Sequence, residues 1–215
     1  MRFPRRRLAL RQRGFASSQA KSMVILDSST ALGLLSRLHA HKNAGYGDAW
    51  RKRGELLSIF TNLARKYDRL AVGLDKGVTA ADERILDTAG DLCVYAAKYL
   101  TWLAERAPQD FDAVSGPSAE ECADRGGTEA IDVVLGAIKV PSGDVRGSWS
   151  AVKAAFEPLE QGLIAQGEGL TSLTWARKVE LAWALASTSA ALLLALAAEN
   201  PGQEEAWRAE IEEMG

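Results

Sequence analysis

Cysteine and histidine, from which proteins most often build disulfides, zinc sites and nucleophile–base pairs, are nearly absent from this chain. Its 215 residues include only two of each. Cys93 and Cys122 do not have the spacing of a zinc motif, and we do not expect them to form a structural disulfide. His39 and His41 lie two residues apart, which on a helix turns their side chains about 200° from each other, so they cannot share a metal ion. We expect both histidines to be exposed near a helix end.

β-Branched and aromatic residues are also scarce, whereas alanine and leucine dominate the apolar residues. Aromatic residues make up 7% of the chain and hydrophobic residues 47%. Because alanine and leucine lose little conformational freedom on entering a helix, this balance favours helices over strands. A chain of this length can form one domain, or one domain with a smaller helical appendage. We therefore predict an all-α protein, a bundle of four or more helices.

Several short motifs that mark common enzyme classes are missing as well. The chain contains no Gly-x-x-x-x-Gly-Lys-Ser/Thr phosphate-binding loop, no Gly-x-Ser-x-Gly nucleophile elbow and no cysteine–histidine nucleophile pattern. The sequence therefore gives no support to a P-loop nucleotide hydrolase or to an α/β-hydrolase.

Acidic residues are missing from the first 22 positions, which carry a charge of +7, so the other 193 residues carry −9 of the total of −2. This arginine-rich stretch has the composition of an organelle transit peptide; a flexible basic arm, or an extension upstream of a start at Met23, also explains it. We expect residues 1–26 to form a disordered basic extension. The acidic remainder argues against a stable nucleic-acid complex, and it is compatible with small polyanions reached through a metal ion.

The spacing of apolar residues predicts a series of helices along the rest of the chain. Ser28 or Ser29 can cap the first helix, Gly73 is a good stop for the second, and Pro108 closes the third. The expected helices span about 28–42, 53–72, 80–105, 128–139, 149–165, 172–199 and 204–213, the last of them acidic and solvated. We expect a helical module over residues 27–105, a polar linker over 106–127, and a C-terminal helical region of unknown type over 128–215.

The helix expected at 172–199 contains eighteen uncharged residues, from Leu181 to Ala198. That length meets the lower limit for a membrane span. However, polar residues lie at its centre, and a helix that is apolar all round can equally be the central helix of a bundle. We favour the buried helix, and with it a cytoplasmic protein that is not bound to a membrane.

The helix expected at 80–105 carries three acids, Glu83, Asp87 and Asp91, at positions i, i+4 and i+8. This spacing places successive carboxylates on one helix face, where they repel one another unless a cation lies among them. Magnesium prefers carboxylate oxygens, so the three residues are candidate Mg²⁺ ligands. The alternative is the solvated face of an amphipathic helix.

The helix expected at 53–72 carries a complementary polar stripe. Helical geometry aligns Glu55 with Asn62, Lys66 and Arg69 along one side of the apolar face. If this helix packs antiparallel to the next, Lys66 and Arg69 can lie against its acids or against a phosphate, whose charge they would neutralise during phosphoryl transfer. Ordinary ion pairing between helices explains the same residues.

The segment between the first two expected helices mixes aromatic and charged groups with glycine. Such a loop could stack on a base and contact a phosphate, although a tryptophan that anchors the loop to the core is the commoner arrangement. The candidate substrate-binding residues of this segment are Lys42, Tyr46, Asp48, Trp50 and Arg51.

Three segments of this region are recognisable together, and they cover roughly residues 30–104. In order, they are KNAGYGDAWR at 42–51, LARKYDRL at 63–70 and DTAGDLCVYA at 87–96. Their combined pattern resembles the nucleotide-modification-associated domain 1 family of phage and bacterial genomes. That family looks related to the all-α nucleotide pyrophosphatases, which include the MazG-like proteins and the dimeric dUTPases.

The resemblance implies a MazG-like helical core and a magnesium-dependent reaction. The related pyrophosphatases bind magnesium with acids from two helices and cleave a nucleoside triphosphate to the monophosphate and pyrophosphate. Asp87 and Asp91 would occupy the second acidic pair, and Glu55 would contribute from the preceding helix. The chain departs from that pattern because Ser58 stands where those proteins have a second glutamate. A site that is short of a carboxylate can bind metal weakly, or hold a nucleotide without hydrolysing it.

Three functional hypotheses follow from the sequence. The first is a magnesium-dependent enzyme that hydrolyses nucleoside triphosphates or modified nucleotides, with Glu55, Lys66 and Arg69 in catalytic roles. The second is a non-catalytic nucleotide-binding accessory protein of nucleotide or DNA modification. The third is a helical interaction or assembly protein. In the first two the partner is a small-molecule nucleotide, and we expect a homodimer because a three-helix unit leaves apolar surface to cover.

Overall fold

The computed structural model describes residues 26–76, 85–114, 116–123, 128–169 and 173–214, without the side chains of Tyr46 and Lys76. The described residues are almost entirely helical and form no strand, which confirms the prediction of an all-α helical bundle. The basic extension predicted at 1–26 lies almost wholly outside the described residues, as does Glu83.

The helices follow one another through short connections. The α-helices are α1 (Ser28–Tyr46), α2 (Thr61–Lys76), α3 (Ile85–Arg106), α4 (Pro108–Val114), α5 (Ala119–Cys122), α6 (Glu129–Ala137), α7 (Val145–Gly167), α8 (Trp175–Glu199) and α9 (Pro201–Glu213). Between α1 and α2 the chain forms a 3₁₀ helix, η1 (Gly47–Trp50), and then a π-helical segment, η2 (Glu55–Phe60), that runs directly into α2.

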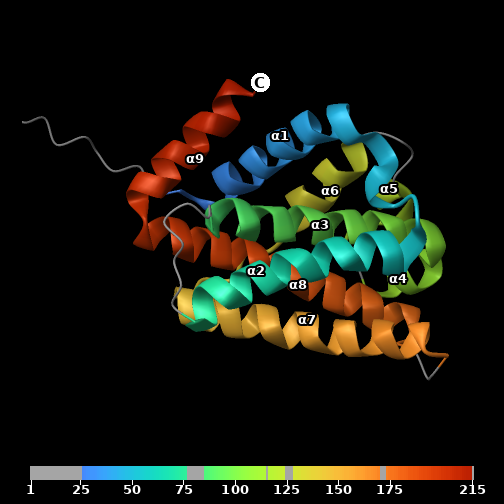
Figure 1. Ribbon diagram of the computed structural model, residues 1–215. Coiled ribbons are helices and arrows are strands. Elements are labelled where there is room, and N and C mark those ends of the chain that lie inside the picture. The colour runs from blue at the N-terminus through green and yellow to red at the C-terminus, as the bar shows by residue number, and fades with distance from the viewer. Residues whose placement is uncertain (1–25, 77–84, 115, 124–127, 170–172, 215) are drawn as a thin grey trace, which may run out of the picture.

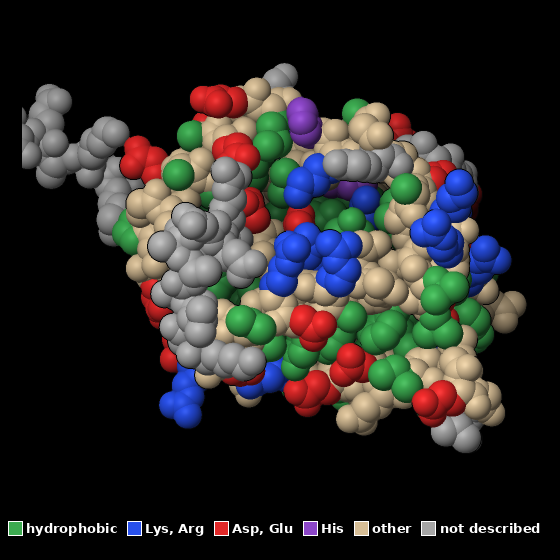
Figure 2. All heavy atoms as spheres, in the orientation of Figure 1, with side chains coloured by type: hydrophobic (Ala, Val, Ile, Leu, Met, Phe, Trp, Pro, Cys, Tyr) green, Lys and Arg blue, Asp and Glu red, His purple; other side chains and the backbone are tan. Residues whose placement is uncertain are grey.

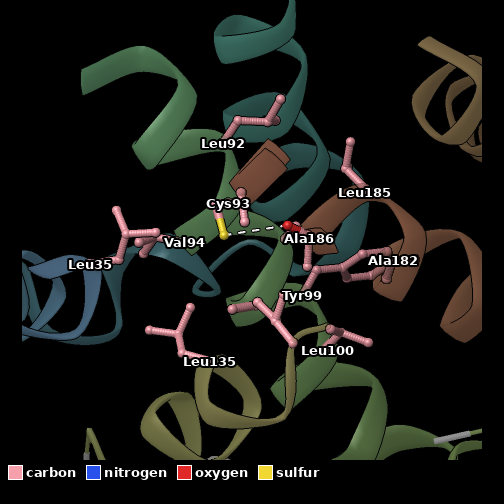
Figure 3. Close-up of a cluster of buried hydrophobic side chains, with 14 of the residues drawn as sticks. Leu35, Leu92, Cys93, Val94, Tyr99, Leu100, Leu135, Ala182, Leu185 and Ala186 are labelled. Carbon is pink, nitrogen blue, oxygen red and sulfur yellow. Dashed lines mark hydrogen bonds between the residues drawn. The ribbon is translucent and has the colours of Figure 1, made fainter. Parts of the chain in front are cut away.

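Two long apolar helices, α3 and α8, pack along each other through the middle of the bundle. Helices α2 and α7 cover one side of this pair, and α1 and α6 cover the other, as Figure 1 shows. Figure 3 shows the core between them, where the Cys93 thiol of α3 donates to the carbonyl of Ala186 in α8 at 3.5 Å. A single hydrophobic cluster runs from Leu26 to Ile211, so residues of the expected N-terminal module and of the C-terminal region share one core.

Helix α8 lies at the centre of the bundle. Within the described residues it is the one helix that is long and apolar enough to cross a membrane, and 67% of its most apolar window is buried inside the protein. Its N-terminus is capped by Thr174, whose side chain accepts a hydrogen bond from the Arg177 amide at 3.2 Å. The prediction of a buried central helix is confirmed.

The segment predicted to be a polar linker, 106–127, instead contains α4 and α5, so that prediction is wrong. Phe111 and Cys122 are completely buried, and the ring of Phe111 lies 6.4 Å from that of Trp183 in α8. Helix α3 ends at Arg106, just before Pro108 as expected, and Pro108 begins α4, because proline fits the first turn of a helix, where its missing N–H costs nothing. The two cysteines are both buried and form no disulfide with each other.

Several predicted helix ends also need correction. The cap of α1 is Asp27, whose carboxylate accepts the Thr30 amide at 2.8 Å, so neither Ser28 nor Ser29 caps it. Gly73 does not end α2, which continues to Lys76. Helix α9 is only partly solvated, because one of its faces buries Trp207 and Ile211 against the bundle.

Candidate functional site

The clearest candidate site is a cavity of about 430 Å³ lined by residues of α1, η1, α2 and α3. Figure 2 shows a hollow near the middle of the visible face, with lysine and arginine side chains at its rim. A volume of this size lies within the range of small-ligand sites.

Asp91 of α3 lies in the wall of this cavity, between two lysines that come from different helices. Lys42 of α1 donates to Asp91 Oδ1 at 2.8 Å, and Lys66 of α2 donates to Asp91 Oδ2 at 2.5 Å. The side chains of Asp91 and Lys66 are only 14% and 15% exposed, whereas that of Lys42 is 43% exposed. The expected packing of Lys66 against an acid of the next helix is therefore confirmed.

The electrostatic state of Asp91 follows from these contacts. Burial by itself raises the pKa of this carboxyl, but the hydrogen bonds and positive charges of Lys42 and then Lys66 outweigh burial, so the net pKa lies below its ordinary value. Asp91 is consequently a carboxylate at neutral pH, and both of its oxygens accept a charged hydrogen bond.

Local sequence explains why Lys66 reaches Asp91. In α2, Leu63 and Leu70 are fully buried against the core, and Lys66 lies between them, three residues after one and four before the other. Helical periodicity places it at the edge of the buried face, where a long side chain can pass along apolar surface and present its ammonium group to α3.

The cavity is strongly cationic. Its described lining holds four basic side chains and one carboxylate, a formal charge of +3; they are Lys42, Arg65, Lys66, Lys98 and Asp91. The Lys98 side chain is 7% exposed, and its ammonium group lies 5.3 Å from the centre of the Trp50 ring and 5.4 Å from that of Tyr95. These cation–π contacts hold a positive charge against the aromatic part of the wall.

The candidate binding residues of the η1 region separate into two groups. Lys42 and Trp50 line the cavity, and Trp50 is 6% exposed, so it also anchors this region to the core. Arg51 instead pairs with Glu105 of α3 through two hydrogen bonds of 2.7 and 2.9 Å. Asp48 is exposed on η1, and the side chain of Tyr46 is not among those described.

Glu55, the other predicted catalytic acid, belongs to a different polar cluster. It is 8% exposed, it does not belong to the described lining of the cavity, and its two oxygens accept from Lys178 of α8 at 3.0 and 2.8 Å. Tyr99 of α3 donates to the same carboxylate at 2.5 Å. Burial, followed by the charge of Glu55, raises the pKa of Tyr99 well above its ordinary value, so the phenol stays protonated and remains a donor. The cluster ties the start of η2 to the two central helices.

Among the described residues, the candidate Mg²⁺ ligands are not brought together in the cavity. They contain no group of three histidine, cysteine, aspartate or glutamate side chains able to hold a metal ion. Both oxygens of Asp91 are already paired with lysines, and Asp87, half-buried one turn earlier, lies outside the described lining of the cavity. Arg69 is exposed and also lies outside that lining, while Glu83 falls outside the described residues. The magnesium site stays a prediction.

Several lining residues were not singled out in the sequence. His39 is 3% exposed and lines the cavity, so the prediction that both histidines are exposed is wrong for this one. It lies one turn after the buried Leu35, a spacing that indicates the inner face of α1. Arg65 lies within the segment LARKYDRL, and Lys98 lies two residues after DTAGDLCVYA on the same helix. Nothing in the sequence distinguishes either of them from a lysine or arginine that faces solvent.

Comparison of the chain with models of known protein families, with curated proteins and with solved structures finds no match in any of the three. The resemblance to the nucleotide-modification-associated family, and the MazG-like core that it implies, therefore stay predictions.

Proposed function

We propose that the cavity binds the phosphate groups of a small phosphorylated ligand, and that this ligand is a nucleotide. The observation that carries the proposal is the convergence of Lys42 and Lys66, from two helices, on the two oxygens of one anion. Lysines so placed can bind the oxygens of a phosphate in the same way. Arg65 and Lys98 supply further positive charge in the same wall.

Aromatic residues beside the cations support a nucleotide over inorganic phosphate alone. Trp50 and Tyr95 both line the cavity, and about 430 Å³ leaves room for more than one phosphate group. Ligand sites of this kind combine apolar or aromatic walls with a few charged groups that fix orientation. A base or sugar next to the phosphates would use the aromatic part of the wall.

The geometry supports nucleotide binding more directly than nucleotide hydrolysis. Metal-dependent hydrolysis needs carboxylate oxygens that coordinate a metal ion, whereas both oxygens of Asp91 accept hydrogen bonds from lysines. The non-catalytic nucleotide-binding protein is therefore our preferred function, and the magnesium-dependent pyrophosphatase is the variant that the same experiment tests.

The experiment is a calorimetric titration of the full chain with a nucleoside and its mono-, di- and triphosphates, each with magnesium and with a chelator. We expect the phosphorylated compounds to bind and the nucleoside not to bind. Replacing Lys66→Gln should weaken binding by about tenfold or more, because a charge-assisted hydrogen bond is lost. Released monophosphate and pyrophosphate would be assayed in the same samples.

Lys153→Gln is the matched control. Lys153 also pairs with a carboxylate, that of Asp75 at 3.1 Å, but it does not line the cavity. This variant should bind nucleotides as the wild type does. If no phosphorylated compound binds, the proposal is contradicted. If nucleotides are hydrolysed in the presence of magnesium, the pyrophosphatase function is supported in place of non-catalytic binding.

A further inference from the structure

Asp91 is the one carboxylate in the described lining of a cavity that is otherwise cationic. A carboxylate there opposes the entry of any anion, so it calls for an explanation if the cavity binds phosphates. Its position supplies one, because each of its oxygens holds a different lysine in the wall.

The arrangement of Lys42, Asp91 and Lys66 resembles that of a phosphate between two lysines. One anionic oxygen accepts from Lys42 and the other from Lys66, at 2.8 and 2.5 Å. Without an anion between them the two ammonium groups would repel each other, so the Asp91 carboxylate keeps them close to each other. The Lys42 side chain is 43% exposed and carries its charge on a flexible stem, so it can turn from Asp91 to a ligand.

We propose that Asp91 is an internal counter-anion, which holds Lys42 and Lys66 until a phosphate of the ligand takes its place. This inference rests on the proposed function, and it names the class of ligand more closely. The cavity then selects ligands whose phosphate competes with a carboxylate for both lysines.

Charge decides which phosphates can compete. A phosphate monoester or a pyrophosphate carries about two or more negative charges at pH 8, whereas a phosphodiester carries one, no more than Asp91 itself. The preferred ligands are therefore compounds with a terminal phosphate, such as free nucleotides. Phosphodiesters, including the backbone of a nucleic acid, are disfavoured.

The direction in which Asp91→Asn changes the affinity for pyrophosphate tests the proposal. Inorganic pyrophosphate and dimethyl phosphate would be titrated at pH 8 into the wild type and into Asp91→Asn, without metal. We expect the wild type to bind pyrophosphate at least about tenfold more tightly than dimethyl phosphate. Asp91→Asn should bind pyrophosphate at least about fivefold more tightly than the wild type, because no internal anion has to be displaced. A role as a metal ligand, or as a fixed support for the lysines, predicts weaker binding or no change.

Asp75→Asn is the control for the loss of a negative charge as such. Asp75 also accepts from a lysine, but it lies outside the cavity, so pyrophosphate affinity should change by less than about twofold. If Asp91→Asn does not fold, the titrations of the wild type still test the inference. Equal affinities of the wild type for pyrophosphate and dimethyl phosphate would overturn it.

The outcomes separate this inference from the proposed function. If the wild type binds pyrophosphate and Asp91→Asn binds it equally or more weakly, the inference is overturned and the proposal of phosphate binding stands. Binding by Asp91→Asn alone also overturns both proposals, because it would show that no phosphate displaces Asp91 in the natural chain. Absence of binding by both proteins overturns the two proposals together.

Discussion

The Nζ atom of Lys66 lies 2.5 Å from Oδ2 of Asp91, and this contact joins α2 to α3 at the wall of the cavity. Because Lys42 reaches the other oxygen from α1, one carboxylate connects three helices. The same three side chains therefore contribute to stability and form the charged centre of the proposed site.

Stability in acid should depend on Asp91. Its pKa is lower in the folded protein than in the unfolded chain, so its contribution is complete above the ordinary value of 3.8 and is lost as pH falls through the folded value. At pH 7, Asp91→Asn should reduce the free energy of unfolding by about 1–3 kcal/mol. Urea unfolding from pH 7 down to pH 2 measures this difference, which should shrink below pH 4. A difference that is constant over this range would show that the lysine contacts do not form.

Loss of the Glu55 charge should destabilise the fold without weakening phosphate binding. The side chains of Glu55 and Lys178 are 7% and 2% exposed, so Glu55→Gln leaves a buried ammonium group without its counter-charge. We expect a loss of about 3–5 kcal/mol in the free energy of unfolding, part of which the double variant Glu55→Gln/Lys178→Met should restore.

Pyrophosphate titration of the folded Glu55→Gln protein completes this test, because Glu55 is not part of the described cavity lining. Reduced affinity in a protein of normal stability would instead support the catalytic role predicted from the sequence.

Both thiols should be nearly inert in the native protein. Burial raises the pKa of the Cys93 thiol to about 12. Burial, and then the carboxylates of Glu121 and Asp112, raises the pKa of Cys122 to about 11. At pH 8 a thiol reagent should label the folded chain more than about a hundredfold more slowly than the chain in denaturant, since the thiolate is the reactive form. Rapid labelling of either thiol under native conditions would contradict the described core.

The helical fold was predictable because long apolar periodicities do not depend on distant contacts. Helices α3, α7 and α8 lie close to their expected positions for this reason. Helices α4 and α5 were missed because they are short and their sequences are largely polar. What stabilises them is burial of a few side chains, such as Phe111 against Trp183 of α8, and that contact joins residues far apart in the chain.

The candidate site was predictable only in part, and the π-helical segment η2 explains one failure. The stripe that aligned Glu55 with Lys66 assumed 100° per residue throughout. A π-helix turns less per residue, so η2 shifts Glu55 away from that alignment, toward Lys178 of α8. Lys66 lies in the regular part of the helix and meets Asp91 as expected. Lys98 was missed because a single lysine on an apolar helix face gives no signal of a cavity.

The central claim is that phosphorylated ligands bind in the cationic cavity, and mapping of backbone amide shifts by ¹H–¹⁵N NMR tests it most directly. Titration with a nucleoside diphosphate should shift amides of residues 38–50, 62–66 and 91–98, the segments that contribute the described lining. Lys66→Gln should reduce these shifts at the same ligand concentration. Shifts confined to another part of the bundle, or none at a saturating concentration, would contradict the proposed site.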